Sequence, residues 1–216
     1  MKRALMEKLI EWRDNPRRKP LINGARQVGK TWLLKEFGAT HFENVAYVSL
    51  DNDAVARSYF DADLDVRRII ASLSLQLNID IDPLNTLIIL DEIQACPKAI
   101  TSLKYFCENA PEYAVAAAGS LLGLSAHEGS GFPVGKVNML DLAPLSFSEF
   151  LVATGDARFA NLIASGDARL MTPFSSVLEG KLREYYVVGG MPGVVSAYLS
   201  GSNFRAAREI QREILE

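Results

Sequence analysis

The 216-residue sequence has few cysteines and histidines and no long apolar run. Cys96 and Cys107 lack Cys-x-x-Cys spacing, so we expect reduced core thiols of a cytosolic protein. His41 and His127 are far from each other and from any cysteine pair, which excludes a zinc cluster of these residues and predicts no structural metal. No apolar run approaches the roughly 18 residues of a membrane span, and the N-terminus lacks the apolar segment of a signal peptide. We therefore expect a cytoplasmic protein without membrane attachment.

An excess of basic residues is also missing. The chain has 23 Lys and Arg against 26 Asp and Glu, a formal net charge of −3, which does not favour binding to nucleic acid or to an acidic membrane surface. The one dense basic run, Arg13–Lys19, lies just before the first expected strand, and we interpret it as a solvated connector. A chain of this length buries enough apolar surface to fold without disulfides.

Short apolar segments alternate with segments of helical periodicity. The continuous run Leu87–Leu90 is typical of a strand covered on both faces of a sheet. The expected strands are residues 20–23, 44–50, 87–90, 113–118 and 137–142. Helical stripes lie at residues 5–12, 31–37, 66–77 and 97–106, and Gly38 is expected to end the second of them. This alternation predicts an α/β fold with a five-stranded parallel sheet between helices.

The pattern changes near residue 145. Ser146-Phe147-Ser148-Glu149 has the form of a capping box, and Thr172-Pro173 is typical of the start of a longer helix, which Gly189-Gly190-Met191-Pro192 interrupts. A last helical stripe, with no stop signal before the end of the chain, consists of Phe204, Ala207, Ile210 and Ile214. We expect a core at residues 1–145, beginning with a helix at 1–14, and a small helical lid at 146–216 that continues in the natural protein.

One glycine-rich segment lies between an expected strand and an expected helix. Gly24-Ala25-Arg26-Gln27-Val28-Gly29-Lys30-Thr31 matches the pattern Gly-x-x-x-x-Gly-Lys-Thr. Its glycines allow successive backbone N–H groups to point at phosphate oxygens, and the following helix adds its positive N-terminal end. In this interpretation Lys30 reaches the β- and γ-phosphates, the Thr31 hydroxyl takes one magnesium position, and Trp32 ends the nucleotide-contacting segment. The alternative is a purely structural glycine-rich turn.

Two acids follow the buried strand at residues 87–90. Asp91 and Glu92 are therefore expected at its carboxyl end, where ligands bind in open α/β sheets. Asp91 would hold magnesium, commonly through water, and Glu92 would orient or deprotonate an attacking water. The alternative is an acidic turn that leads into the next helix, since acids favour helix N-termini.

Polar residues near other strand ends leave more alternatives open. Ser120 follows a buried strand and could contact the γ-phosphate or the attacking water, or it could cap a helix or turn. Asp51 could face the nucleotide or a partner, although a surface turn is the simpler interpretation. Four arginines could reach the γ-phosphate or lie in surface salt bridges: Arg26, Arg158, Arg169 and Arg183.

Taken together, these segments resemble those of prokaryotic AAA-type ATPases, related to the archaeal-type ATPases, that carry a further C-terminal domain of uncertain function. The motifs are residues 24–31, Leu87-Ile88-Ile89-Leu90-Asp91-Glu92-Ile93-Gln94, Ala117-Ala118-Gly119-Ser120-Leu121-Leu122-Gly123, Phe132-Pro133-Val134-Gly135-Lys136-Val137 and Gly189-Gly190-Met191-Pro192. The resemblance implies a catalytic glutamate after the Walker-B aspartate, a polar sensor on the neighbouring strand and a helical lid. Glu92, Ser120 and residues 146–216 occupy these places. It also implies a domain beyond the lid, where partner and assembly contacts could reside.

The sequence thus predicts an ATPase that binds ATP and Mg²⁺ where Gly29, Lys30, Thr31 and Asp91 converge, and that hydrolyses ATP by attack of water. ATP rather than GTP follows from the resemblance and from the lack of an Asn-Lys-x-Asp segment. One alternative is a slow nucleotide-dependent switch. Another is a small-molecule kinase, which would need a pocket for an acceptor. The expected partners are ATP, the further C-terminal domain and, in a homo-oligomer, other copies of the chain.

Overall fold

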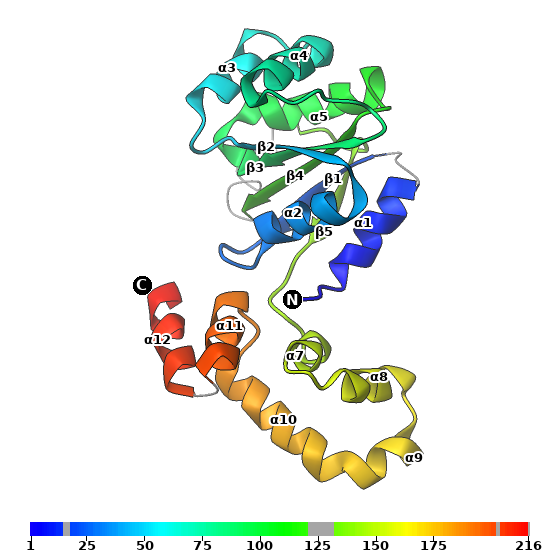
Figure 1. The fold of residues 1–216 in the computed structure, drawn as a ribbon, viewed down its shortest axis with the longest axis vertical. Helices are drawn as coiled ribbons and strands as arrows, with labels where there is room; N and C mark the ends of the chain where they lie inside the picture. The colour runs from blue at the N-terminus through cyan, green and yellow to red at the C-terminus, as the bar shows by residue number, and fades with distance from the viewer. Residues whose placement is uncertain (15–17, 121–131, 202–203, 216) are drawn as a thin grey trace. The chain divides into compact units, whose positions relative to one another are not determined.

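The computed structural model describes residues 1–14, 18–120, 132–201 and 204–215 (Figure 1). The chain divides into two compact units. Leu5–Leu142 form the α/β unit, and Met1–Ala4 together with Ala143–Glu216 form the helical unit. None of the helices in the described residues combines the length and the apolar character that a membrane span needs.

Five parallel strands form the centre of the α/β unit. In spatial order they are β2 (Asn44–Ser49), β3 (Thr86–Asp91), β4 (Ala114–Ser120), β1 (Lys19–Gly24) and β5 (Val137–Asp141). Every residue of β3 is buried, as expected for a strand between two helical layers. Small side chains fill β4, where Ala117 lies opposite both Leu21 of β1 and Leu90 of β3. This architecture confirms the predicted five-stranded parallel sheet between helices.

Helices cover the two faces of this sheet and form a separate core on each (Figure 1). On one face, α1 (Leu5–Asp14) and α2 (Lys30–His41) contribute Trp12 and Phe37, whose ring centroids lie 6.2 Å apart. On the other face, α3 (Ala54–Ala62), α4 (Val66–Leu77) and α5 (Pro97–Asn109) pack around the fully buried Phe60 and Phe106. A short 3₁₀ turn, η1 (Ile93–Ala95), lies between β3 and α5.

Two sequence-based expectations about the α/β unit are wrong. Helix α2 does not stop at Gly38, because it continues to His41; a Cβ atom at Gly38 would meet Val45 Cγ2 at 2.6 Å, so this glycine allows α2 to pack closely on β2. The basic run is not solvated throughout, because Lys19 is the first residue of β1 and is 1% exposed. Residues 15–17 of that run lie outside the described residues.

Helix α3 has no counterpart among the predicted helices. It begins after Asp53, whose carboxylate accepts a hydrogen bond of 2.8 Å from the Ala56 N–H. An aspartate in this position is a strong N-terminal cap. The cluster of acids after β2 is therefore a helix start as well as a turn.

The helical unit consists of short helices after the last strand. They are α7 (Phe147–Ala153), α8 (Ala157–Ser165), α9 (Ala168–Met171), η2 (Thr172–Phe174), α10 (Ser175–Val188), α11 (Pro192–Gly201) and α12 (Phe204–Leu215). The predicted capping box is present: the Glu149 N–H donates to Ser146 Oγ at 3.2 Å, and the Ser146 N–H donates to Glu149 Oε2 at 2.8 Å. Arg3 adds an ion pair of 3.1 Å to Glu149. Thr172-Pro173 forms a 3₁₀ turn just before α10 instead of its first turn.

The link between α10 and α11 packs against the chain segment before α7. The Leu145 N–H donates to Gly190 O at 2.7 Å, and the Tyr185 hydroxyl donates to Leu145 O at 2.7 Å. A Cβ atom at Gly190 would collide with the Leu145 carbonyl oxygen. The Gly-Gly-Met-Pro segment therefore ends α10 and also allows a close backbone contact that anchors the small core around Phe150.

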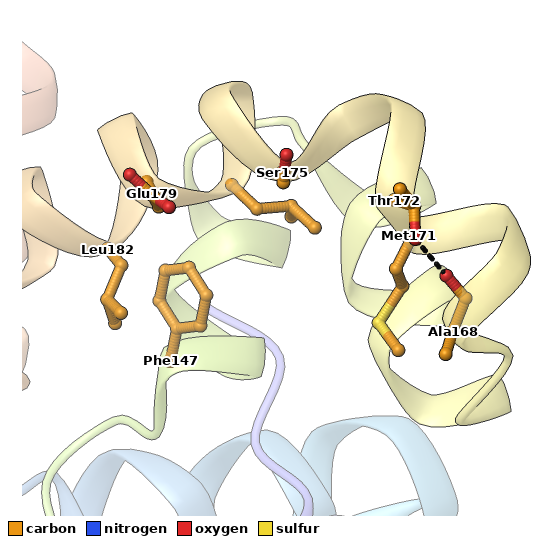
Figure 2. Close-up of a pocket in the computed structure, with 8 residues that line it drawn as sticks. Phe147, Ala168, Met171, Thr172, Ser175, Glu179 and Leu182 are labelled. Atoms are coloured by element: carbon orange, nitrogen blue, oxygen red, sulfur yellow. Dashed lines mark hydrogen bonds between the residues drawn. The ribbon is translucent and has the colours of Figure 1, made fainter.

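An apolar groove of about 410 Å³ lies within the helical unit (Figure 2). Phe147 of α7, Met171 of α9 and Leu182 of α10 are among its lining residues. The Thr172 hydroxyl on its wall donates to Ala168 O at 2.7 Å. The described lining contains Glu179 but neither lysine nor arginine, so this groove lacks a cationic side chain that could pair with phosphate.

Candidate nucleotide-binding site

The strand order brings three chain segments to one edge of the sheet. Strand β4 lies between β1 and β3, and Gly24 at the end of β1 is paired with Ser120 at the end of β4. Asp91 ends β3 on the other side of β4. Because all three strands are parallel, their carboxyl ends meet at the same edge. The structure thus brings together the glycine-rich loop, the acidic pair and Ser120.

The loop from Gly24 to Gly29 has a backbone that only certain residues tolerate. A Cβ atom at Gly24 would collide with the Leu142 carbonyl oxygen, where the chain leaves β5. Gln27 and Gly29 both have positive φ, 60° and 96°. Val28 between them is fully buried and anchors the loop to the core. Alternation of left-handed and ordinary residues points successive N–H groups to one side, which is a typical anion-binding arrangement.

Helix α2 begins immediately after this loop. Its N-cap, Gly29, has no side chain that could accept from the first-turn N–H groups. These donors and the helix dipole therefore face the loop. Trp32, in the first turn, is 43% exposed.

Lys30 is buried at the start of α2. It is 5% exposed, and its Nζ donates to Gly24 O at 2.9 Å and to Ala25 O at 2.8 Å. Burial lowers the pKa of Lys30, whereas the nearby Glu92 and Asp91 raise it and the positive charge of Arg26 lowers it further. The ammonium group is thus held at the backbone carbonyls of the first two loop residues.

Asp91 is the centre of a hydrogen-bond network. It is 2% exposed, and its Oδ2 accepts from the Thr31 hydroxyl at 2.7 Å and from the Tyr47 hydroxyl at 3.0 Å. Its Oδ1 accepts from the Glu92 N–H at 3.1 Å. The network places an oxygen of the loop segment in contact with an oxygen of the acidic pair.

Tyr47 is a member of this network that the sequence analysis did not identify. It lies in β2 beside β3, and only its place next to the acid-bearing strand could have drawn attention to it. Burial raises the pKa of Tyr47 to about 12, and the adjacent Asp91 carboxylate acts in the same direction. The phenol is therefore protonated near neutral pH and donates to Asp91. The Lys35 Nζ lies 3.6 Å from the centroid of the Tyr47 ring.

Glu92 and Ser120 are joined through a residue that was also not singled out, Gln94. Gln94 Nε2 donates to Glu92 Oε2, and Gln94 Oε1 accepts from the Ser120 N–H at 3.2 Å. Glu92 has φ 49° and ψ 45°, a left-handed conformation that is uncommon outside glycine. The only sequence feature that could have indicated this role is the amide side chain two residues after Glu92. Its contact with Ser120 depends on the position of β4 beside β3.

Among the described residues, the other candidates form no hydrogen bond with Asp91, Glu92 or Ser120. Arg26 is exposed on the loop, and Asp51 is exposed in the turn after β2, where its carbonyl accepts from Arg57 Nη1 at 2.8 Å. The remaining arginines belong to the helical unit: Arg158, Arg169 and Arg183. His127 and residues 121–123 of the resemblance motif lie outside the described residues.

The oxygens at the site fit a magnesium ion. Within the described residues, no group of three or more His, Cys, Asp and Glu side chains is placed to hold a metal. Mg²⁺ is commonly bound by only one or two protein oxygens, with phosphate oxygens and waters completing its coordination. Thr31 Oγ1 and Asp91 Oδ2, 2.7 Å apart, are hard oxygens of the type that such a site uses.

A parallel sheet with a glycine-rich phosphate loop after β1 and a buried acid at the end of β3 defines the P-loop NTPase class. Within this class, the family model described as an AAA domain matches residues 17–151, and the chain belongs to this family. This result confirms the resemblance to AAA-type ATPases, with nucleotide binding as the shared feature. A comparison with curated proteins found no match.

Comparison with solved structures found several similar chains, all at low sequence identity. A Walker-type ATPase of Pyrococcus abyssi has a TM-score of 0.55 and 14% identity, over 99% of this chain and 72% of that chain. The Cdc6p protein of Pyrobaculum aerophilum has a TM-score of 0.44 and 16% identity, over 72% of this chain and 48% of that one. The Orc1 protein of Aeropyrum pernix, solved in complex with DNA, has a TM-score of 0.45 and 16% identity, over 94% and 56%. The first of these supports the fold assignment.

Proposed function

We propose that this chain binds ATP with Mg²⁺ and hydrolyses it to ADP and phosphate. The observation that carries the proposal is the 2.7 Å hydrogen bond between the Thr31 hydroxyl and Asp91 Oδ2, because it joins the end of the phosphate loop to the acidic end of β3. Phosphoryl transfer depends mainly on positioning and on charge stabilisation. Both require that the phosphate-binding and metal-binding groups converge.

The loop residues would bind the triphosphate. Backbone N–H groups of residues 24–31 and the first turn of α2 would donate to the β- and γ-phosphate oxygens. Lys30 would exchange its two carbonyl acceptors for charged phosphate oxygens, which form stronger hydrogen bonds. Trp32, on the exposed side of α2, would lie at the border of this site.

Thr31 and Asp91 would hold the magnesium ion, Asp91 directly or through water. When bound, the ion neutralises part of the charge on the phosphate oxygens. Tyr47 would support this role from the second strand by fixing Asp91 Oδ2. We choose ATP over GTP because the family is an ATPase family and because the sequence lacks an Asn-Lys-x-Asp segment.

Glu92 would act on the attacking water. The water oxygen attacks the γ-phosphorus, a water proton passes to the Glu92 carboxylate, and the bond from the γ-phosphorus to the β–γ bridging oxygen breaks to release ADP. Ser120, at the end of the strand between the loop and the acids, would contact the γ-phosphate or the water.

A slow nucleotide switch is a second candidate function. The Glu92 carboxylate is already engaged by Gln94, and a base held in this way could leave turnover slow while binding remains tight. In that case the bound nucleotide would act by favouring one conformation over another. The helical unit and the further C-terminal domain expected from the resemblance would then carry the output.

Turnover and binding of ATP, measured separately on the longest natural chain, test the proposal. We expect the unmodified protein to turn over, and Glu92→Gln to bind ATP normally while losing on the order of 100-fold or more in turnover. Asp91→Asn should lower the apparent affinity for Mg²⁺ most. Glu112→Gln is a matched control, since this glutamate lies before β4 at the opposite end of the strand.

The outcomes separate the two candidate functions. Tight binding without turnover by the unmodified protein would replace the enzyme with the switch. Failure of the unmodified protein to bind ATP would overturn both. Equal turnover by Glu92→Gln and the unmodified protein would remove Glu92 from the proposed mechanism.

A further inference from the structure

The Gln94 carboxamide contacts two groups of opposite polarity. The Ser120 N–H can only donate, so it must meet Oε1; an ionised Glu92 carboxylate can only accept, so it must meet Nε2. These two partners fix which way the amide points. A side chain in this position needs a donor and an acceptor at the same end, and glutamine supplies both without a charge.

The backbone around Gln94 is fixed by the turn that contains it. In η1 the Ala95 N–H donates to Glu92 O at 2.9 Å and the Cys96 N–H donates to Ile93 O at 3.0 Å. Glu92 itself is left-handed, and a residue of this type in such a conformation needs surrounding contacts to hold it there. The turn therefore sets the distance at which Gln94 can reach back to Glu92.

A general base must be kept within hydrogen-bond reach of its water, and small displacements cost large factors in rate. A glutamate side chain has several rotatable bonds, so an exposed one is poorly confined. In this site the carboxylate of Glu92 is tied to Gln94, and Gln94 is tied to the backbone at the end of β4. The end of β4 is also where Ser120 would meet the γ-phosphate.

We propose that Gln94 is a positioning residue. It orients the Glu92 carboxylate toward the water that attacks the γ-phosphorus, and it connects Glu92 to the end of β4. This inference rests on the proposed ATP hydrolysis, in which Glu92 is the base. Contact of the γ-phosphate with Ser120 would be transmitted through one amide to the base. Gln94 touches neither the nucleotide nor the water in this scheme.

Two substitutions of Gln94 distinguish this role from a structural one. Gln94→Leu removes both hydrogen bonds, and we expect about a tenfold fall in kcat with ATP binding unchanged. Gln94→Glu keeps the shape but places a carboxylate against Glu92. We expect about a 100-fold fall in kcat at pH 8, because the introduced group then repels Glu92 and cannot donate to it.

The pH profile gives the sharper readout. At low pH the introduced carboxyl becomes protonated, donates to Glu92 and accepts from the Ser120 N–H, so the original pattern returns. The ratio of variant to unmodified kcat should therefore rise at least about tenfold from pH 8 to pH 5.5, whereas Gln94→Leu should give a flat ratio. In the described part of the chain, the other titratable groups that interact with Glu92 are Asp91 on β3, Lys30 on α2 and Tyr47 on β2. They are present in both proteins and cancel in the ratio.

Gln76 offers a matched control. Its Nε2 donates to Asp53 Oδ2 at 2.6 Å, which is the same type of contact on α4. Gln76→Glu should leave kcat and its pH profile unchanged. The inference is overturned if Gln94→Leu retains full kcat, if it loses ATP binding, or if the Gln94→Glu ratio does not depend on pH. No turnover by the unmodified chain would instead overturn the proposed function, and the inference with it.

Discussion

A buried lysine lies at the start of strand β1 and another at the start of α2, beyond the loop that follows this strand, and only the second lies in the proposed site. Lys19 at the amino end is 1% exposed and donates to Pro111 O at 3.1 Å and to Tyr113 O at 2.6 Å. Lys30, just beyond the carboxyl end, is 5% exposed and also donates to two backbone carbonyls. Burial lowers the pKa of both side chains, that of Lys19 to about 8.

Their surroundings differ in the groups that could accept a ligand. Beside Lys30 are a loop of left-handed residues, the uncapped start of α2 and the network around Asp91. Lys19 instead has a structural role, because its ammonium group donates hydrogen bonds that connect β1 to the turn before β4. Burial of a lysine is therefore no sign of a binding site by itself. The carboxyl edge of a parallel sheet supplies the additional groups.

Replacing each lysine by methionine should separate their roles most strongly. Lys30→Met removes a charged donor to the phosphates, and we expect turnover to fall on the order of 1,000-fold, or about 4 kcal/mol in activation free energy. ATP affinity should fall as well. Lys19→Met should leave ATP affinity, measured by titration at pH 7, unchanged to within about twofold.

Equal loss of ATP binding by both variants, with both still folded, would contradict the assignment of different roles to Lys30 and Lys19. A thermal melt of each variant checks that point. Lys104→Met, a change at an exposed lysine of α5, supplies the background for losing one positive charge.

The second largest effect should be on stability at high pH. Burial holds the pKa of Lys19 near 8 in the folded protein, against 10.5 for the ordinary side chain, while Cys107 and Glu112 oppose the shift. Between these values the unfolded chain binds a proton that the folded chain does not, so stability rises with pH. The span of 2.5 pKa units corresponds to about 3 kcal/mol. This gain in stability is complete above pH 10.5, decreases as the pH falls toward 8, and is absent below pH 8, where both states bind the proton.

Urea unfolding of the unmodified protein and of Lys19→Met between pH 7 and pH 10.5 measures this contribution. Other groups titrate in the same range, so the informative quantity is the difference in slope between the two proteins. We expect the unmodified protein to gain more stability with pH than the variant. Parallel curves would show that Lys19 remains charged while buried.

The same two lysines show which features of the structure can be predicted from local sequence and which cannot. Lys30 was identified because the phosphate loop is a local pattern, with its strand, glycines and helix all contiguous. Lys19 was misassigned because it follows other basic residues, and local charge does not reveal that the first position of a central strand is buried. The fold class was predictable because buried parallel strands are continuous apolar runs.

Contacts between strands were not predictable in this way. Tyr47 reaches Asp91 because β2 lies beside β3, and Gln94 reaches Ser120 because β4 lies beside β3; strand order is not a local property of a sequence. In the helical unit, the capping box was found from its four residues, whereas α8 and α11 were missed. Helix α8 begins after Asp156, which makes no side-chain cap, and α11 begins at Pro192, the last residue of the Gly-Gly-Met-Pro segment that predicted a break.

The smallest effect expected at the carboxyl end comes from Tyr47. Tyr47→Phe removes only the hydroxyl that donates to Asp91 Oδ2, so about 1 kcal/mol of stabilisation of that carboxylate should be lost. If Asp91 holds Mg²⁺, the concentration of Mg²⁺ that gives half-maximal turnover should rise about fivefold, with maximal turnover nearly unchanged. Tyr105→Phe on α5 is the matched control. If only maximal turnover changed, Tyr47 would instead act on Glu92, the proposed base. The hydrogen-bond network around Asp91 would then extend to that base.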